Sequence, residues 1–322
     1  MPAEDQPPRK LSLVIPVYNE VESLAKLKDE IDAVGQSLNH AIEIIFVDDG
    51  STDGSWNTIR ALAGADARVH GIRFRRNFGK AAALEAGFRK ITGDIVFTLD
   101  ADLQDDPKEI PQFLAKLDAG YDLVSGYKQV RHDPWHKVFP SRVFNWMISR
   151  ITGVKLHDHN CGFKAYRAEV TREVRLYGEL HRFVPVLAAA RGFRISEIVV
   201  EHRARKFGKS KFGARRFLKG FLDLVQTSFI TTFGWRPMHF FGTIATLLFL
   251  LAAAGIALLG ANAILRELID DKWGFGVGVQ FTMILGIAVL GIIGVNAIFI
   301  GYIAELLASR RIDEPFAIAE ST

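Results

Sequence analysis

The stretch that decides the fold reads IVFTLDADLQD and covers residues 95–105. Its first five residues, 95–99, are apolar or β-branched and predict a short buried strand, because such runs fill the interior of parallel sheets. Two aspartates, Asp100 and Asp102, follow directly. Residues i and i+2 of a strand point the same way, so we expect both carboxylates to face one point at the end of this strand.

Further runs of the same kind occur in the first two thirds of the chain. Segments of helical period, such as residues 21–38 and 80–90, lie between them. This alternation predicts an α/β fold with a mostly parallel sheet flanked by helices. The expected strands are residues 11–17, 42–47, 69–74, 95–99, 122–125 and 195–201.

Ligands of such sheets bind beyond the carboxyl ends of the strands. Tyr18 and Glu20 follow the first expected strand, and Asp48 and Asp49 follow the second. No G-x-G-x-x-G comes after any of these strands, so the phosphate-cradling turn of a Rossmann dinucleotide site is missing. The sequence instead predicts a crevice lined by acidic and polar side chains.

Paired carboxylates are the oxygen donors that Mg²⁺ or Mn²⁺ uses when it also binds a pyrophosphate. Such an ion would neutralise a leaving diphosphate. A D-x-D pair by itself is also common in ordinary turns, and Asp105 or Asp106 could cap a helix opened by Pro107. The surrounding motifs decide between these interpretations.

Hydrophobicity is concentrated in the last third of the chain. Residues 238–260 and 274–304 contain no Asp, Glu, Lys or Arg. Each run is longer than the roughly 20 apolar residues that cross a bilayer. The alternative is a pair of buried core helices, but such helices rarely stay uncharged beyond two or three turns. We therefore predict two membrane spans.

Basic residues flank these spans. By the positive-inside rule they place both chain ends and the predicted α/β domain in the cytosol, at the inner or plasma membrane. Residues 212–232 are expected to form an amphipathic helix along the interface. The flanking residues are Arg215, Arg216, Lys219 and Arg236 before the first span and Arg310 and Arg311 after the second, with Trp235 and Trp273 as expected interfacial anchors.

The N-terminal residues and the cysteine content agree with this location. The first ten residues lack the apolar stretch of a secretory signal peptide. Cys161 is the only cysteine, so no intrachain disulfide can form, which fits a reducing compartment.

Four ordered blocks carry a resemblance to a known family. They are PVYNE at residues 16–20, VDDGSTDGS at 47–55, RNFGK at 76–80 and DADLQD at 100–105. Together they resemble the GT-A-fold family 2 glycosyltransferases, and the two predicted spans resemble those of the membrane-anchored members, which implies a place in the cell envelope. The chain is most similar to polyprenyl-phosphate hexose synthases of the dolichyl-phosphate mannose synthase and undecaprenyl-phosphate glucosyltransferase type, from about residue 11 to 213.

The resemblance implies roles for donor-side residues. Strand-end packing, turn formation and a solvated helix face are the structural alternatives for these positions. The implied nucleotide-binding residues are Pro16, Tyr18, Glu20, Asp48, Asp49, Lys80 and Ala101, and the implied metal ligands are Asp100, Asp102 and Gln104.

An acceptor site follows from the same resemblance. A lipid monophosphate carries about 1.5 to 2 negative charges near neutral pH, so it needs compensating cations more than a strong base. Asp158 is expected to position or deprotonate the acceptor, and Arg205 belongs to a basic loop, residues 202–212, that covers the site. The acceptor-phosphate residues are expected to be Arg131, Ser141, Arg142, Ser210 and Lys211.

Two other interpretations concern this acceptor region. The basic loop could bind anionic headgroups alone, whereas nucleic acid is a poor choice beside a bilayer. His157, His159 and Cys161 alternate, which suggests zinc, but no fourth ligand is evident and a core or supporting role is favoured.

The sequence therefore predicts an inverting, metal-dependent hexosyltransferase. It would move a hexose from a UDP- or GDP-sugar to undecaprenyl or dolichyl phosphate. A family 2 polysaccharide synthase would need a Q-x-x-R-W motif and more spans, and a catalytically silent scaffold is separable only by assay. The sugar, the lipid length and a monomer versus a homo-oligomer stay undecided.

The expected organisation has five parts along the chain. They are a flexible N-terminus (1–10), a catalytic domain (11–211), juxtamembrane helices (212–236), a two-helix anchor (237–308) and a cytoplasmic tail (309–322).

Overall fold

The computed structural model describes residues 9–38, 40–129, 135–201, 203, 215–234, 236–268 and 274–309; for 135–141, 215–219 and 221 it describes the backbone only. The chain divides into two compact units, Met1–Ser228 and Phe229–Thr322. The five-part division expected from the sequence is finer than this and stays a prediction.

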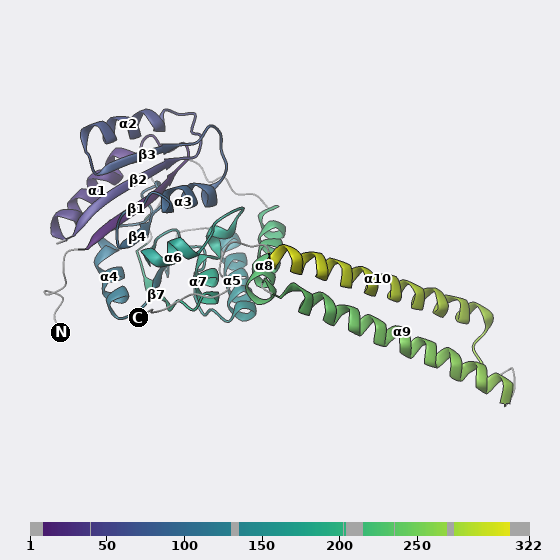
Figure 1. Cartoon of the computed structure of the whole chain (residues 1–322). Coiled ribbons are helices and arrows are strands. Elements are labelled where there is room, and N and C mark those ends of the chain that lie inside the picture. The colour runs from purple at the N-terminus through teal and green to yellow at the C-terminus, as the bar shows by residue number, and fades with distance from the viewer. Residues whose placement is uncertain are drawn as a thin grey trace. The chain divides into compact units, whose positions relative to one another are not determined.

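A seven-stranded sheet forms the centre of the first unit, in the order β3-β2-β1-β4-β6-β5-β7 (Figure 1). All its pairings are parallel except those of β6 with β4 and β5. The predicted, mostly parallel sheet is therefore confirmed. The strands are β1 Lys10–Val17, β2 Ala41–Asp48, β3 Val69–Arg73, β4 Ile95–Thr98, β5 Leu123–Tyr127, β6 Lys164–Arg167 and β7 Ile195–Val199.

All six expected strands are present, and β6 is an addition that the sequence did not predict. Its four residues, KAYR, are too short and too polar to form an apolar run. Lys164 is nevertheless 3% exposed, because the strand lies between β4 and β5. Tertiary position overrides local propensity here.

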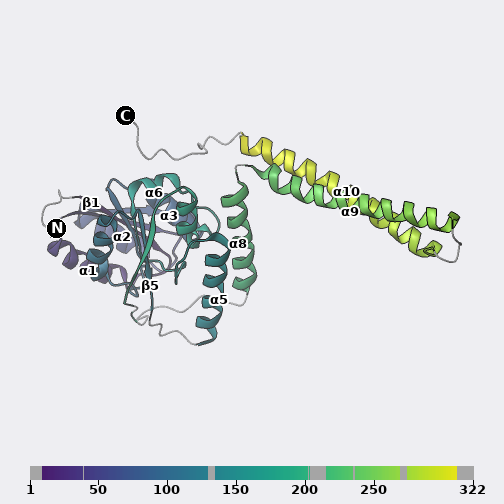
Figure 2. The ribbon, with the colours of Figure 1, turned by 90° about the horizontal axis from the view of Figure 1, so that it is seen from below.

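Helices cover both faces of the sheet (Figures 1 and 2). Side chains of β1 alternate between the faces: Leu11 and Leu13 pack into the core with α1, α2 and α4, whereas Val14 packs with α3, α5, α6, α7 and α8. The helices of this unit are α1 Leu24–Ser37, α2 Ser55–Ala65, α3 Lys80–Phe88, α4 Ile110–Asp118, α5 Trp135–Thr152, α6 Ala168–Glu173, α7 Val184–Ala190 and most of α8 Arg215–Phe233, whose last turn belongs to the second unit, with short 3₁₀ helices η2 Pro107–Glu109 and η3 Leu180–Arg182.

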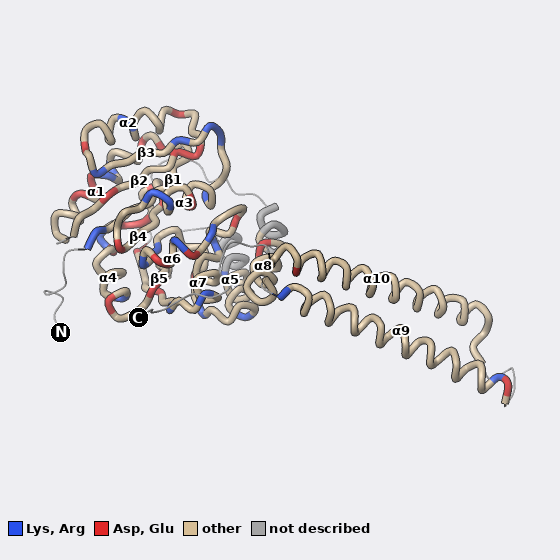
Figure 3. Tube along the Cα trace, viewed as in Figure 1, with Lys and Arg blue, Asp and Glu red and all other residues tan. Residues whose placement is uncertain are grey.

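Two long helices dominate the second unit, α9 Pro237–Leu268 and α10 Val277–Ser309. Only 11% of the most apolar window of each is buried, which contradicts the core-helix alternative. Both helices are long and apolar enough to cross a membrane, and in Figure 3 charged residues on them are confined to their ends. The two helices pack closely, since a β-carbon on Gly294 would lie 2.8 Å from Phe249 Cε1.

Candidate active site

A cleft of about 300 Å³ opens at the carboxyl ends of β1 and β4. The chain order reverses here, because β2 and β3 extend the sheet to one side of β1 and β4 lies on the other. The cleft contains every predicted nucleotide residue except Asp48, and both aspartates of the D-x-D pair. Its lining is Pro16, Val17, Tyr18, Glu20, Asp49, Asn77, Gly79, Lys80, Asp100, Ala101 and Asp102.

The loop after β1 is bound to the loop after β2, which places Tyr18 and Glu20 in the cleft. Asn19 has a left-handed backbone, with φ 58°, that few residues other than glycine tolerate as well as asparagine. Its side-chain Oδ1 accepts a hydrogen bond of 2.8 Å from Thr52 N. Glu20 N donates to Ser55 Oγ at 3.0 Å. These bonds hold the two loops together.

Asp48 and Asp49 are adjacent but have different surroundings. Asp48 is fully buried, accepts a bond of 2.9 Å from Ser51 N and lies 3.4 Å from Arg73 Nε. Asp49 lines the cleft and accepts bonds from the backbone N–H groups of Phe78 and Gly79. Burial raises the pKa of Asp49, partly opposed by those two N–H groups. The structure thus brings Asp49, and not Asp48, into contact with the cleft.

Asp100 and Asp102 lie in a turn and not in a strand, which corrects the expected geometry. The strand β4 ends at Thr98, and Leu103 has a left-handed φ of 62°. Both carboxylates nevertheless line the same cleft. The i, i+2 rule was the wrong reason for a correct juxtaposition.

Lys80, the first residue of α3, forms an ion pair with Asp100 Oδ1. Partial burial would raise the pKa of Asp100, but the positive charge and hydrogen bond of Lys80 lower it to about 2. Asp100 is therefore ionised throughout the neutral range, as a cation ligand must be.

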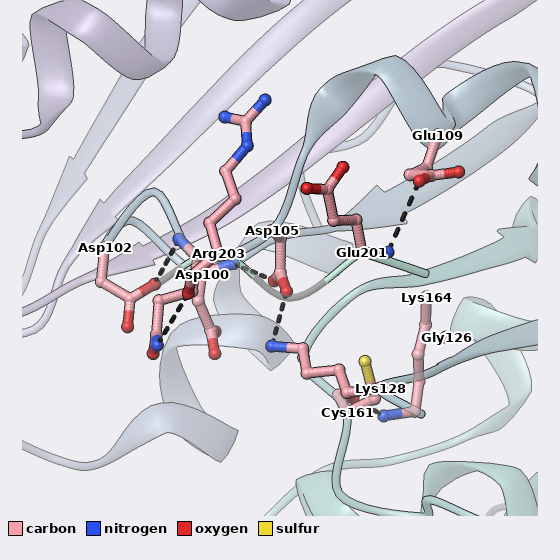
Figure 4. A network of polar contacts seen from close by, with 12 residues as sticks. Asp100, Asp102, Asp105, Glu109, Gly126, Lys128, Cys161, Lys164, Glu201 and Arg203 are labelled. Carbon is pink, nitrogen blue, oxygen red and sulfur yellow. Dashed lines mark hydrogen bonds and ion pairs between the residues drawn. The ribbon is translucent and has the colours of Figure 1, made fainter. Parts of the chain in front are cut away.

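A third aspartate, Asp105, supports this turn from the interior (Figure 4). Its Oδ2 accepts a bond of 3.3 Å from Asp100 N, and its Oδ1 lies 2.7 Å from Lys128 Nζ. Burial would lower the pKa of Lys128, but the charge of Asp105 raises it above its usual value. Lys128 was missed in the sequence, although it directly follows strand β5 and is the first charged residue after it.

Gln104 and Arg203 connect the turn to the start of the basic loop. Gln104 Nε2 donates to Arg203 O at 3.4 Å, and Arg203 N donates to Gln104 O at 3.1 Å. The Arg203 guanidinium pairs with Glu30 at 2.7 Å and with Asp106. Gln104 does not line the cleft, so its predicted role as a metal ligand receives no support from its position.

Asp158 begins a loop that α5 holds in place. Asn145 Nδ2 donates to His157 O at 2.9 Å, and Ser149 Oγ donates to Leu156 O at 3.2 Å. Asp158 itself is 2% exposed and accepts a bond of 3.1 Å from Asn160 N. Its expected role at the acceptor stays a prediction.

His157, His159 and Cys161 point to different partners, which disfavours the zinc interpretation. His157 pairs with Glu197, and His159 Nε2 lies 3.1 Å from Ser149 Oγ. Burial raises the pKa of the Cys161 thiol to about 12. Within the described ranges, no three His, Cys, Asp or Glu side chains are grouped as metal ligands.

Several predicted acceptor residues lie outside the described part of the chain. They are Arg131, Arg205, Ser210 and Lys211. The same holds for four residues predicted to flank the membrane spans, Trp235, Trp273, Arg310 and Arg311. Ser141 lies on α5 with its side chain undescribed, and Arg142 is exposed on the same helix.

The chain matches a family model described as glycosyl transferase family 2 over residues 12–175. Its fold is similar to that of glucosyl-3-phosphoglycerate synthase from Mycobacterium tuberculosis, with a TM-score of 0.53 at 18% identity over 69% of this chain and 78% of that one. Mannosyl-3-phosphoglycerate synthase from Rubrobacter xylanophilus gives 0.53 at 15% identity, over 68% and 73%. The chain belongs to glycosyl transferase family 2 and has the GT-A fold.

A curated relative is more similar along the whole sequence. Dodecaprenyl-phosphate galacturonate synthase from Rhizobium johnstonii is 38% identical over 306 residues, which cover 93% of this chain and 88% of the relative. The match therefore includes residues from both units.

Proposed function

We propose that this enzyme transfers a hexose or hexuronic acid from a UDP- or GDP-sugar to a polyprenyl phosphate, with inversion at the anomeric carbon. The observation that carries the proposal is the cleft in which Asp100 and Asp102 face the β1 loop, in a chain 38% identical to a polyprenyl-phosphate sugar synthase. Two helices long and apolar enough to cross a membrane support a lipid acceptor.

The donor half of the cleft suits a nucleoside diphosphate. Pro16 and Tyr18 offer an apolar and aromatic wall for a base, and Glu20 and Asp49 offer acceptors for ribose hydroxyls. Two carboxylates with the phosphates and water are enough to hold Mg²⁺, so Asp100 and Asp102 fit a divalent cation. When bound, that cation would supply neutralisation of the diphosphate charge.

The reaction would be a single displacement. A lipid phosphate oxygen attacks the anomeric carbon, the new carbon–oxygen bond forms, and the bond to the nucleoside diphosphate breaks on the opposite face. The attacking phosphate is already anionic, so positioning contributes more than proton removal. Asp158 would orient the acceptor, and the basic side chains of residues 131–142 and 205–211 would balance its charge.

The orientation in the membrane is part of the proposal. Basic residues before α9 and after α10 support a cytosolic catalytic domain. The nucleotide sugar would then be taken from the cytosol and the product released into the inner leaflet.

A donor panel tests the proposal. Purified full-length enzyme would be incubated with undecaprenyl phosphate and labelled UDP-glucose, UDP-galacturonate, GDP-mannose and related donors, with Mg²⁺ or Mn²⁺ and with EDTA. We expect one donor to give a lipid-linked sugar whose formation EDTA stops.

Asp100→Asn serves as the matched variant, because it keeps the side-chain shape and removes the charge. It should lose most transfer while folding normally. Near-normal transfer by a folded Asp100→Asn variant would contradict the donor-site assignment, and no product from any donor would contradict the activity.

A further inference from the structure

Gly162 lies in the loop that leads from Asp158 into β6. The antiparallel pairing of β6 with β4 sets Lys164 opposite Thr98. Thr98 Oγ1 donates a hydrogen bond of 2.7 Å to Gly162 O, and this fixes the glycine beside the end of β4. The loop that carries Asp158 therefore passes directly against the turn that carries Asp100 and Asp102.

Asp100 occupies the space where a side chain of residue 162 would be. A β-carbon on Gly162 would lie 2.6 Å from Asp100 Oδ2, 2.8 Å from Cγ and 2.9 Å from Oδ1. Real β-carbons essentially never approach another heavy atom within 3.0 Å. The three nearest atoms all belong to this one carboxylate.

The backbone gives no separate reason for glycine at this position. Gly162 is not among the residues with a left-handed φ, unlike Gly50 or Gly79. Alanine could therefore adopt the same backbone conformation. What glycine provides here is room for the Asp100 carboxylate.

The Asp100 side chain is 34% exposed but is held by its contact with Lys80. Lys80 binds its Oδ1 on one side, and Asp105 Oδ2 accepts from its backbone N–H. The Asp100 carboxylate now points into the cleft. An added methyl group at residue 162 would turn it away from that direction. Such a shift would change the geometry of the ion pair between Asp100 Oδ1 and Lys80.

We propose that Gly162 is a positioning residue. Because it has no side chain, the loop that carries Asp158 can lie against the Asp100 carboxylate and direct that carboxylate toward the donor's divalent cation. This rests on the proposed function, which assigns the cation to Asp100 and Asp102. The contact between Gly162 and the Asp100 carboxylate then fixes the position of the loop carrying Asp158 relative to the turn carrying the D-x-D pair. The donor and acceptor sites are therefore aligned by the same contact.

The test is Mn²⁺ binding by full-length Gly162→Ala, followed through the electron paramagnetic resonance signal of free Mn²⁺ with UDP present. Mn²⁺ affinity should fall by about 10- to 100-fold, as for other residues that orient metal ligands. Calorimetric binding of UDP in EDTA should stay at the wild-type level, a result that general misfolding would not give.

Two further sets of variants complete the test. Gly64→Ala, at an exposed position of α2 with open space around it, is the matched control and should bind Mn²⁺ as the wild type does. Thr98→Val removes the hydroxyl that holds Gly162 and should weaken Mn²⁺ binding in the same direction, while Thr98→Ser restores it. The Thr98 pair decides the matter if Gly162→Ala does not fold.

Wild-type Mn²⁺ affinity in Gly162→Ala, with loss of binding in Asp100→Asn, would overturn the inference and leave the proposed function standing. An equal loss of affinity of Gly162→Ala for UDP in EDTA and for Mn²⁺ would also overturn the inference. Wild-type Mn²⁺ binding by Asp100→Asn would instead contradict the metal site itself.

Discussion

Replacing Lys128 by methionine should destabilise the catalytic unit strongly, although Lys128 does not line the donor cleft. Lys128 Nζ lies 2.7 Å from Asp105 Oδ1, and the two side chains are 13% and 0% exposed. Methionine keeps most of the volume but leaves the Asp105 carboxylate buried without its cation. Breaking a buried ion pair by removing one partner costs about 3–5 kcal/mol.

This free energy corresponds to a measurable shift in melting temperature. For a unit of this size, 1 kcal/mol changes the Tm by about 2–4 °C, so a drop of roughly 6–20 °C is expected. The assay is thermal unfolding of detergent-purified full-length protein followed by near-UV circular dichroism. Asp105 also holds Asp100 N, so transfer activity should fall together with stability.

Two controls separate the buried pair from a general effect of losing a lysine. Lys108→Met, at an exposed position, should change the Tm little. The double variant Lys128→Met/Asp105→Leu removes both charges and should recover most of the lost stability. A decrease in Tm of less than about 2 °C for Lys128→Met would refute the reasoning. A double variant with a Tm as low as that of the single variant would refute it as well.

Three more expectations concern pH, the nucleotide and the acceptor. Burial lowers the pKa of His159 from 6.5 to about 4. The contribution of the neutral imidazole to stability is therefore present above pH 6.5 and is lost as the pH falls through 4, by about 3 kcal/mol in all. The free energy of unfolding of His159→Gln, measured with denaturant, should fall less steeply over this pH range, and an unchanged fall would contradict this. Asn19→Ala should weaken UDP or GDP binding about tenfold in calorimetry, because it loses both the bond to Thr52 N and a residue suited to a φ of 58°, whereas Asn19→Gly should lose less. Arg205→Ala should lower transfer to polyprenyl phosphate more than nucleotide binding, and equal losses would remove it from the acceptor side.

The positions of the strands, the two long apolar helices and the acidic motif could be predicted because each depends on local pattern. An apolar run between polar segments is buried wherever the sheet forms, and a long uncharged run predicts a helix able to cross a membrane. The cleft at the ends of β1 and β4 followed from the rule that parallel strands end on one edge. Asp100 and Asp102 line this cleft, and their role as metal ligands stays a prediction.

Contacts between distant segments could not be predicted in the same way. Asp48 and Asp49 have the same chemistry, and only the turn after β2 decides that Asp49 faces the cleft. Strand β6 has no apolar pattern of its own and exists because β4 and β5 leave hydrogen-bonding partners for it.

The sequence by itself determined a mostly parallel α/β domain, two long apolar helices and an acidic pair after a strand, because periodicity and composition act over neighbouring residues. The tertiary structure alone decided which side chains support that pair. Lys128, which follows β5, meets Asp105, which follows β4, and Gly162 meets Asp100 through the antiparallel insertion of β6. Such contacts depend on how segments far apart in the chain are brought within a few ångströms, and no local pattern encodes that distance.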